Sequence, residues 1–118
     1  PFDGAACLLT MHFLDPDKRL QTLQQVRQRL KPGAPFVVMH ISYAQDPEAR
    51  EVWLDREEAY LVASGSAPED ARRRREAVSK ALHSLSPQRD EELLRQAGFS
   101  NVTLFYAAFT FRGWVAYA

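Results

Sequence analysis

The sequence predicts an α/β fold, built from a parallel strand–helix–strand unit, a helical insertion and a closing antiparallel hairpin. Three observations carry this prediction. Two apolar runs flank an amphipathic helical pattern within residues 1–41, charged helical patterns fill residues 46–83, and two β-type segments end the chain. About five residues separate those last segments, which is too few for a parallel crossover, so we expect an antiparallel pair.

The first unit begins with a short apolar run, Asp3–Thr10, that lacks polar alternation. Such a run suits a strand that is covered on both faces of a parallel sheet. We expect the next helix to begin at Asp15, a good N-cap residue, with Pro16 at its first position, and to end near Leu30. Its apolar stripe has helical spacing and consists of Leu20, Leu23, Val26 and Leu30.

Pro32 and Gly33 end this helix, because proline cannot continue it and glycine readily adopts the left-handed cap conformation. The second strand is predicted at Phe36–Ile41, which is again apolar on both faces. A strand, a helix and a strand joined by connections of a few residues form a right-handed parallel crossover.

Residues 44–85 are predicted to form a helical insertion. A first helix opens at Asp46 and extends to about Ala63, and the capping-box spacing of Ser66 and Glu69 starts a second helix. The apolar side of the first helix consists of Val52, Trp53, Tyr60 and Leu61. The thin apolar face of the second consists of Ala71, Val78, Ala81 and Leu82. Two charged helices between core strands indicate a lid or cap.

The last part of the chain is predicted to form a helix and two strands. The helix begins at Ser86–Pro87 and ends at Gly98, with Phe99 placed to close a Schellman cap. Its inward residues are Leu93, Leu94 and Ala97. The strands are Asn101–Ala108 and Trp114–Tyr117. One face of the first of them is expected to carry Val102, Leu104 and Tyr106.

The composition is that of one soluble globular domain, with 46% hydrophobic and 25% charged residues in a chain of 118. Fifteen basic residues balance fifteen acidic ones, so no global charge favours nucleic acid or an anionic membrane. No apolar run approaches the ~20 residues of a membrane span. The single cysteine, Cys7, excludes an internal disulfide and fits a reducing, cytoplasmic compartment. Because the chain starts at Pro1 and not at Met, we expect it to be a fragment or a processed chain.

Four segments carry a family resemblance: FDGAACLLTMHFL (2–14), RLKPGAPFVVMHIS (29–42), LLRQAGFSNVTLFY (93–106) and GWVAYA (113–118). In this order they resemble the C-terminal half of class I S-adenosylmethionine-dependent methyltransferases. The resemblance implies half of a doubly wound Rossmann-like sheet, with strands 4-5-7-6 of the methyltransferase order and the last strand antiparallel. The tail is similar to the branch that includes carboxy-S-adenosylmethionine synthases.

The chain departs from the family pattern in its glycines. Family members bind the cofactor through a glycine-rich loop after strand 1 and an acidic residue ending strand 2, and neither feature is present. No two glycines have GxGxG spacing among Gly4, Gly33, Gly65, Gly98 and Gly113. The resemblance therefore implies one wall of a site at the topological switch point. We expect the intact protein to use S-adenosylmethionine and the isolated chain to bind it poorly or not at all.

The resemblance places the segment after the first strand near the methionine part of the cofactor and the reacting methyl group. This segment consists of Thr10, Met11, His12 and Phe13. His12 is a catalytic candidate that would orient a nucleophile or take its proton, because imidazole titrates near neutrality. The alternative for His12 is a loop histidine without a task.

Further substrate-binding candidates are His40, Ser42 and Tyr43, which end the second strand at the same sheet edge, and Trp53 and Tyr60 of the insertion. The alternative for His40 is a satisfied core histidine. For Trp53 and Tyr60, which lie on one helix face, the alternative to stacking on a substrate is packing.

Arg72–Arg75 with Lys80 could bind a phosphorylated substrate or RNA. The alternative is a solvated helix, because four adjacent arginines spread around all sides of it. The three histidines and Cys7 lack metal-ligand spacing, so no metal is expected.

The leading hypothesis is that the intact protein is a methyltransferase acting on a small molecule or RNA, with this chain as its substrate-side portion. Such transfer depends mainly on positioning and needs no signature catalytic residue. The alternative is a catalytically incompetent module that forms a homodimer or other complex through the exposed strand Asp3–Thr10. A dehydrogenase-type dinucleotide domain fits less well, because its sheet usually ends in a parallel strand.

Overall fold

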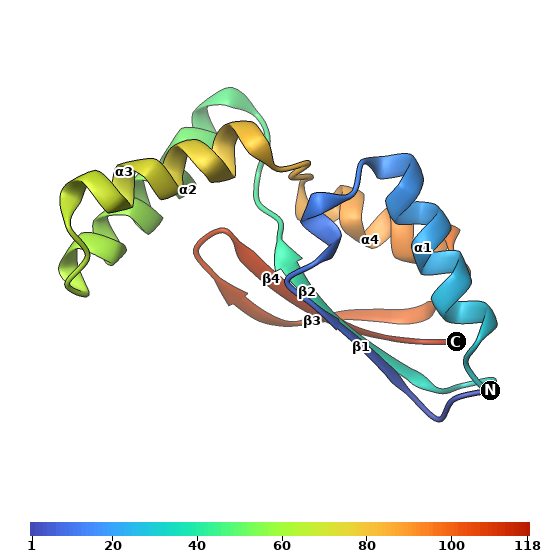
Figure 1. Cartoon of the computed structure of the whole chain (residues 1–118). Coiled ribbons are helices and arrows are strands. Elements are labelled where there is room, and N and C mark those ends of the chain that lie inside the picture. Colours follow the sequence, from blue (N-terminus) through green and yellow to red (C-terminus); the bar gives the residue numbers. More distant parts are fainter.

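The computed structural model describes residues 1–118, apart from the side chain of Ala81, as an elongated molecule of 47 × 25 × 19 Å (Figure 1). The strands are β1 (Ala5–Leu8), β2 (Pro35–Ile41), β3 (Ser100–Ala108) and β4 (Phe111–Tyr117). The α-helices are α1 (Pro16–Gln28), α2 (Pro47–Ala63), α3 (Pro68–Glu76) and α4 (Pro87–Gln96). Two short segments complete the order, the 3-10 turn η1 (Met11–Phe13) and the π-helical turn η2 (Ala77–Ala81).

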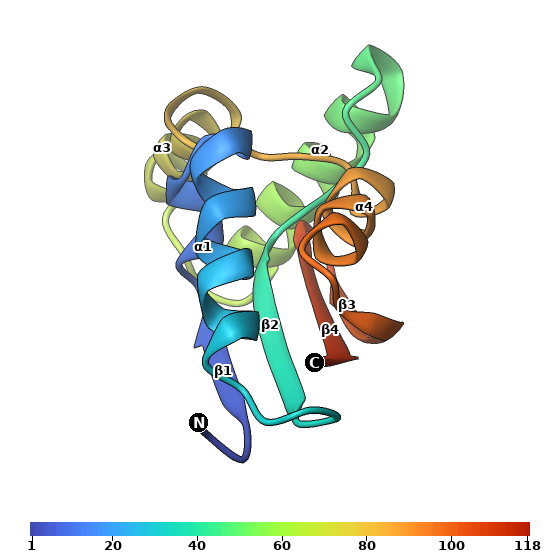
Figure 2. The same cartoon turned by 90° about the vertical axis from the view of Figure 1, so that its right-hand side faces the viewer.

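The strands form one sheet in the order β1-β2-β4-β3, which confirms the predicted sheet. β1 runs parallel to β2, and β4 runs antiparallel to both β2 and β3. The crossover from β1 to β2 passes through α1. Figures 1 and 2 show α1 and α4 on the same face of the sheet. We call the sheet with these two helices the body.

Capping residues fix the starts of α1 and α4 and the end of α4 as the sequence predicted. The predicted left-handed cap of α1 at Gly33 does not form, because α1 ends at Gln28 with Arg29 as its C-cap residue. The side chains of Asp15 and Ser86 each accept a backbone hydrogen bond at the starts of α1 and α4. α4 ends before Gly98, whose φ of +99° is the left-handed conformation. Phe99 N–H then donates to the Leu94 carbonyl oxygen at 3.1 Å, which completes the Schellman cap.

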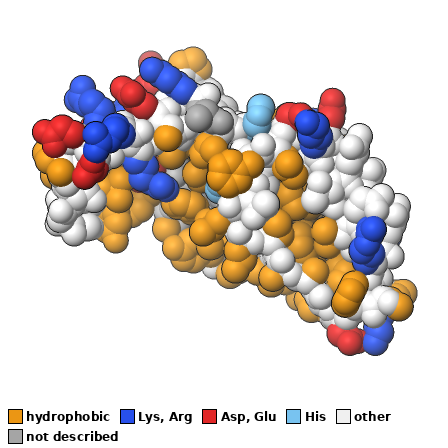
Figure 3. Space-filling model, viewed as in Figure 1, with side chains coloured by type: hydrophobic (Ala, Val, Ile, Leu, Met, Phe, Trp, Pro, Cys, Tyr) orange, Lys and Arg blue, Asp and Glu red, His pale blue; other side chains and the backbone are white. Residues whose placement is uncertain are grey.

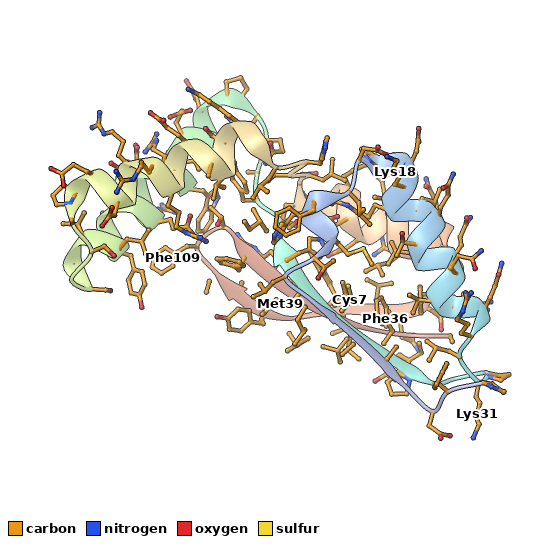
Figure 4. All side chains as sticks on the ribbon, viewed as in Figure 1. Cys7, Lys18, Lys31, Phe36, Met39 and Phe109 are labelled. Carbon is orange, nitrogen blue, oxygen red and sulfur yellow. The ribbon has the colours of Figure 1, made fainter. Side chains whose placement is uncertain are left out.

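The main core lies between the sheet and the two body helices. Phe36 and Val38 of β2 lie beside Ala116 and Trp114 of β4, and none of the four is more than 1% exposed. The helices add Leu23, Leu93 and Leu94. Burying each large apolar side chain contributes about 1.5–3 kcal/mol, so this layer is the main stabilising element. Cys7 of β1 faces the same layer (Figure 4), and burial raises the pKa of its thiol.

The opposite face of the sheet carries exposed apolar side chains. One row crosses all four strands in register through Leu8, Met39, Gly113 and Tyr106. Leu8 and Tyr106 are 53% and 44% exposed. Figure 3 shows hydrophobic side chains gathered along the sheet. Gly113 keeps the row close-packed, because a Cβ there would lie 3.2 Å from Tyr106 Cβ.

β3 contains two irregularities of register, one of them between Leu104 and Tyr106. Leu104 lies opposite Trp114, and Tyr106 lies opposite Gly113. Because those partners are consecutive on β4, they point to opposite faces of the sheet. The prediction that Val102, Leu104 and Tyr106 share one face is therefore wrong, since the irregularity breaks the alternation of side chains.

α2, α3 and η2 form an arm that projects beyond the carboxyl ends of β1 and β2 (Figure 1). A second, smaller core cluster joins it to the sheet through Ile41, Tyr43, Leu54 and Val78. Ala71 and Val78 are only 1% and 2% exposed, which confirms this part of the predicted inner face of the second arm helix.

Two predictions for the arm are wrong. The buried residues of α2 are Leu54 and Glu57, whereas Val52 and Tyr60 of the predicted apolar side are 44% and 52% exposed. Four charged residues, Asp55–Glu58, follow Leu54 directly, so the sequence does not show that Leu54 and Glu57 form the inner face.

The predicted capping box of Ser66 and Glu69 does not form either. The N-cap of α3 is Ala67, which makes no side-chain cap hydrogen bond. Pro68 at the first helical position sets the start of the helix instead, because its fixed φ suits that position.

Candidate functional site at the sheet edge

A cavity lies at the carboxyl ends of β1 and β2, where the arm meets the sheet. We call it the edge cavity, and its volume is about 420 Å³. Its lining residues are Leu9, His12, Phe13, Ile41, Arg74, Ala77, Val78, Leu82 and Phe111. Ligand sites in open α/β sheets form at this end of the strands, so the cavity is the first candidate for a functional site.

His12 has a well-defined geometry in this cavity. It is 5% exposed, and its Nδ1 accepts a hydrogen bond of 3.0 Å from Ile41 N–H. Burial, together with charge repulsion from His40, Arg19 and Arg74, lowers the pKa of His12 to about 4. At neutral pH the imidazole is therefore uncharged, with its proton on Nε2. This state favours hydrogen-bond donation over proton abstraction, and the catalytic assignment of His12 stays a prediction.

The neighbours of His12 take different positions. Phe13 is 62% exposed and lines the edge cavity, with its ring 4.5 Å from the His12 ring. Met11 is 1% exposed, and its side chain packs in the main core. The Thr10 hydroxyl donates to the Leu8 carbonyl oxygen at 3.1 Å. The structure thus brings His12 and Phe13 to the cavity, and the assignment of this segment to a cofactor stays a prediction.

A second cavity of about 370 Å³ shares Arg74 and Phe111 with the edge cavity, and we call it the aromatic cavity. Tyr60 and Phe109 line it with their rings stacked 4.5 Å apart. Figure 4 shows Phe109 at the tip of the β3–β4 hairpin, beside the arm. The guanidinium of Arg74 lies 5.6 Å from the centre of the Phe111 ring, at the junction of the two cavities.

His40 belongs to a buried polar cluster beneath the body helices. Arg19 of α1 donates to Asp90 of α4 at 2.7 Å, and His40 Nε2 lies 3.3 Å from the same carboxylate oxygen. None of the three is more than 3% exposed. Burial raises the pKa of Asp90, but the polar contact and charge of His40 and the charge of Arg19 outweigh it and lower the pKa overall. His40 is therefore buried next to a carboxylate, but neither of its ring nitrogens has a hydrogen-bond partner among the described residues, and its assignment to a substrate stays a prediction.

The other candidates lie around the edge of the site. Ser42 and Tyr43 are both 0% exposed, and the Ser42 hydroxyl donates to the Leu85 carbonyl oxygen at 3.4 Å. Burial raises the pKa of Tyr43. Trp53 lies between two arginine side chains, each 4.8 Å from its ring centre. None of these three belongs to the described lining of either cavity, so their assignments to a substrate stay predictions.

The arginine run of α3 does not act as one patch. Arg75 forms ion pairs of 2.5–3.1 Å with three carboxylates of α2, and Arg73 pairs with Asp70. Arg74 alone among these three lines the edge cavity. The sequence indicated the run Arg72–Arg75 only as a unit, because helical periodicity does not show which of four adjacent arginines faces inward. Phe111 was not predicted as a site residue, because it precedes the predicted last strand.

The edge cavity combines apolar walls with a few polar groups, which is the composition of a site that binds and orients a small molecule. Within the part of the chain that the structure describes, no group of three or more His, Cys, Asp or Glu side chains could hold a metal ion. None of the described helices is long and apolar enough to cross a membrane.

Comparison with solved structures defines the class of this fold. PigF with SAH matches with a TM-score of 0.64 and 16% identity, over 98% of this chain and 30% of that one. Human N-acetylserotonin methyltransferase in complex with SAM matches with a TM-score of 0.63 and 15% identity, over 98% of this chain and 29% of that one. The chain has the fold of the C-terminal half of a class I S-adenosylmethionine-dependent methyltransferase, as the sequence resemblance predicted.

Comparison with curated sequences finds similarity to carboxy-S-adenosyl-L-methionine synthases. The carboxy-S-adenosyl-L-methionine synthase of Pseudomonas fluorescens (strain SBW25) is 28% identical over 116 residues, which are 98% of this chain and 47% of the synthase. The synthase of Ectopseudomonas mendocina (strain ymp) is 28% identical over 107 residues, which are 91% of this chain and 43% of the synthase. The chain thus spans about half the length of these relatives. No protein-family profile matches it.

Proposed function

We propose that the chain forms the substrate-side half of an S-adenosylmethionine-dependent methyltransferase that acts on a small molecule. The observation that carries this proposal is the edge cavity, which opens at the carboxyl ends of β1 and β2 in a fold shared with SAM-bound and SAH-bound proteins. The names of the curated relatives also support a ligand of the S-adenosylmethionine type. The cavity volume of about 420 Å³ is in the range of small-molecule pockets, which favours such an acceptor over RNA.

In this proposal the chain acts by positioning. The segment Thr10–Phe13 contacts the methionine end of the cofactor, and His12 and Phe13 face the acceptor. Tyr60 extends the acceptor site into the aromatic cavity. The arm covers the site and limits the access of water. Methyl transfer from a sulfonium requires reacting atoms aligned at roughly 3–3.5 Å, so walls that orient the acceptor are the main contribution of this half.

The proposal is tested by cofactor binding. The sequence has no two glycines with GxGxG spacing, so we expect the cofactor loop to come from polypeptide beyond these 118 residues. Isothermal titration with S-adenosylhomocysteine should give micromolar affinity for the product of the full reading frame and no measurable affinity for the isolated chain. Absence of binding by the full product would refute the proposal, and tight binding by the isolated chain would refute the division of the site.

A second candidate function is an interaction module, and the observation that favours it is the free edge of β1. β1 lies at the end of the described sheet and pairs only with β2. Leu8 and Leu9 beside this edge are 53% and 48% exposed. Unpaired edges of this kind invite pairing with another chain, so the segment Asp3–Thr10 would form a homodimer. Sedimentation velocity at increasing concentration tests this, and a chain that stays monomeric throughout would exclude it.

A further inference from the structure

The described lining of the edge cavity contains hydrogen-bond donors but no acceptor side chain. Seven of its nine residues are apolar, and the two polar ones are His12 and Arg74. We infer that the cavity binds a ring-sized apolar small molecule that carries a carboxylate, with His12 Nε2 and Arg74 as its two donors. The inference deepens the proposed function, on which it rests only in identifying this ligand with the methyl acceptor.

His12 is fixed as a donor by its surroundings. A neutral imidazole has one donor and one acceptor nitrogen. Because Nδ1 accepts the hydrogen bond from Ile41 N–H at 3.0 Å, the proton must lie on Nε2. The backbone is anchored as well, since the His12 carbonyl oxygen accepts a hydrogen bond of 2.9 Å from His83 N–H. The ring therefore cannot easily turn to offer an acceptor to the ligand.

Arg74 supplies the positive charge. Arg73 and Arg75 pair with carboxylates, whereas none of the described ion pairs includes Arg74. The carboxylate that lines the adjacent aromatic cavity together with Arg74 is that of Glu57. It is 5% exposed and accepts a hydrogen bond of 2.8 Å from the Thr110 hydroxyl, and no described ion pair joins it to Arg74. A guanidinium matches a carboxylate with two parallel hydrogen bonds, so the unpaired Arg74 favours this group on the ligand.

The other lining residues of the edge cavity select the apolar part of the ligand. Phe13 and Phe111 provide aromatic surface, and the other lining residues are aliphatic. Flat rings pack well against such walls. An ammonium group would meet a guanidinium and no acceptor side chain in the described lining, and burying it without a partner is costly. The cavity should therefore discriminate between an acid and an amine of the same shape.

The test is a titration of the ¹⁵N-labelled 118-residue chain, followed by NMR, with 1-naphthylacetate and 2-(1-naphthyl)ethylamine as matched probes. We expect the acid to shift the amides of Leu9, Ile41 and Phe111 and to bind at least tenfold more tightly than the amine. Arg74→Gln should weaken the acid about tenfold, whereas Arg73→Gln, a neighbour outside the cavity lining, should leave its affinity unchanged. No binding of the acid, equal or tighter binding of the amine, or equal effects of the two variants would overturn the inference.

A second measurement does not depend on any variant. The ¹⁵N shifts and two-bond couplings of the imidazole in the unmodified chain report which nitrogen carries the proton. We expect the Nε2–H tautomer of His12 at pH 7, and an Nδ1–H or charged ring would overturn the inference. Acid binding without cofactor binding by the full product would refute the proposed methyltransferase function and leave this assignment of the cavity standing. Cofactor binding without acid binding would refute the assignment of the cavity and leave the proposed function standing.

Discussion

The body and the arm are held together by different forces. In the body, a continuous apolar core surrounds one buried charged cluster, in which Arg19 and Asp90 are 1% and 3% exposed. In the arm, the apolar contacts are few. Arg75 of α3 forms ion pairs with three carboxylates of α2, whose side chains are 24% to 69% exposed. The same residue types therefore contribute differently in the two regions, because solvent screens the arm pairs and leaves the body pair unscreened.

The edge cavity lies where the two regions meet. Leu9 after β1, together with η1, β2 and β4, contributes one side from the well-packed body, and α3 and η2 contribute the other from the polar arm. A site with one rigid wall and one weakly held wall is suited to admit a ligand and then close over it. Substitutions matched between body and arm test this difference in stability directly.

The largest expected contrast is between two tryptophans. Trp114→Ala should lower the free energy of unfolding by about 3–5 kcal/mol, because Trp114 is 0% exposed and its removal leaves a cavity in the core. Trp53→Ala should cost about 1 kcal/mol, because Trp53 is only partly buried and contacts Arg56 of the arm and Arg112 of β4 through its ring. Urea unfolding followed by far-UV circular dichroism measures both. Equal losses would show that the arm is as tightly packed as the body.

Charge removal should give the next contrast. Asp90→Asn should cost about 3 kcal/mol, because it leaves the buried guanidinium of Arg19 without its counter-charge. Asp70→Asn, which removes the surface partner of Arg73, should change the unfolding free energy by less than about 0.5 kcal/mol. Urea unfolding of the two variants provides the comparison, and similar values for both would contradict the assigned role of the buried cluster.

The pH dependence of stability should report on His12. Its pKa falls from an ordinary 6.5 to about 4 in the folded protein, so the unfolded chain takes up the proton first. A neutral His12 therefore stabilises the folded protein above pH 6.5, and this stabilisation is lost as the pH falls toward 4. The free energy of unfolding should fall by about 2.5 kcal/mol between pH 7 and pH 4.5. His12→Gln should lose this part of the pH slope in urea unfolding at those two pH values. Parallel profiles for the two proteins would count against a buried neutral His12.

The smallest expected effect is in the arm ion pairs. Arg75→Gln should lower stability by about 1 kcal/mol at low ionic strength and by less in 1 M salt, because the carboxylate partners are exposed. Arg72→Gln serves as the control, since no described ion pair includes Arg72. Unfolding at two salt concentrations checks the prediction, and a loss that does not depend on salt would indicate a packing role for Arg75.

The body could be predicted from the sequence because its signals are local. Apolar periodicity, the Asp15 and Ser86 caps and the Gly98–Phe99 cap each act within a few residues, and all are confirmed. The short connection before the last strand was sufficient to predict the antiparallel hairpin. The register irregularity at Leu104 was not predictable, because no residue in that stretch requires it.

The candidate site was predicted only where it follows a strand end. His12 and Phe13 were found because residues after a parallel strand lie at the ligand edge of the sheet. Arg74 was predicted only as part of the run Arg72–Arg75, because helix phase within an arginine run is ambiguous. The buried pair of Arg19 and Asp90 was missed because the two residues are 71 positions apart and each reads as an ordinary surface residue of a helix.

The central claim is that the carboxyl ends of β1 and β2 face the cofactor in the intact protein. Hydrogen–deuterium exchange of the full reading-frame product, with and without S-adenosylhomocysteine, tests it most directly. We predict slower amide exchange in the segment Thr10–Phe13 when the ligand is bound, with little change in α1 or α4. Ligand binding that protects other regions and leaves Thr10–Phe13 unchanged would contradict the account.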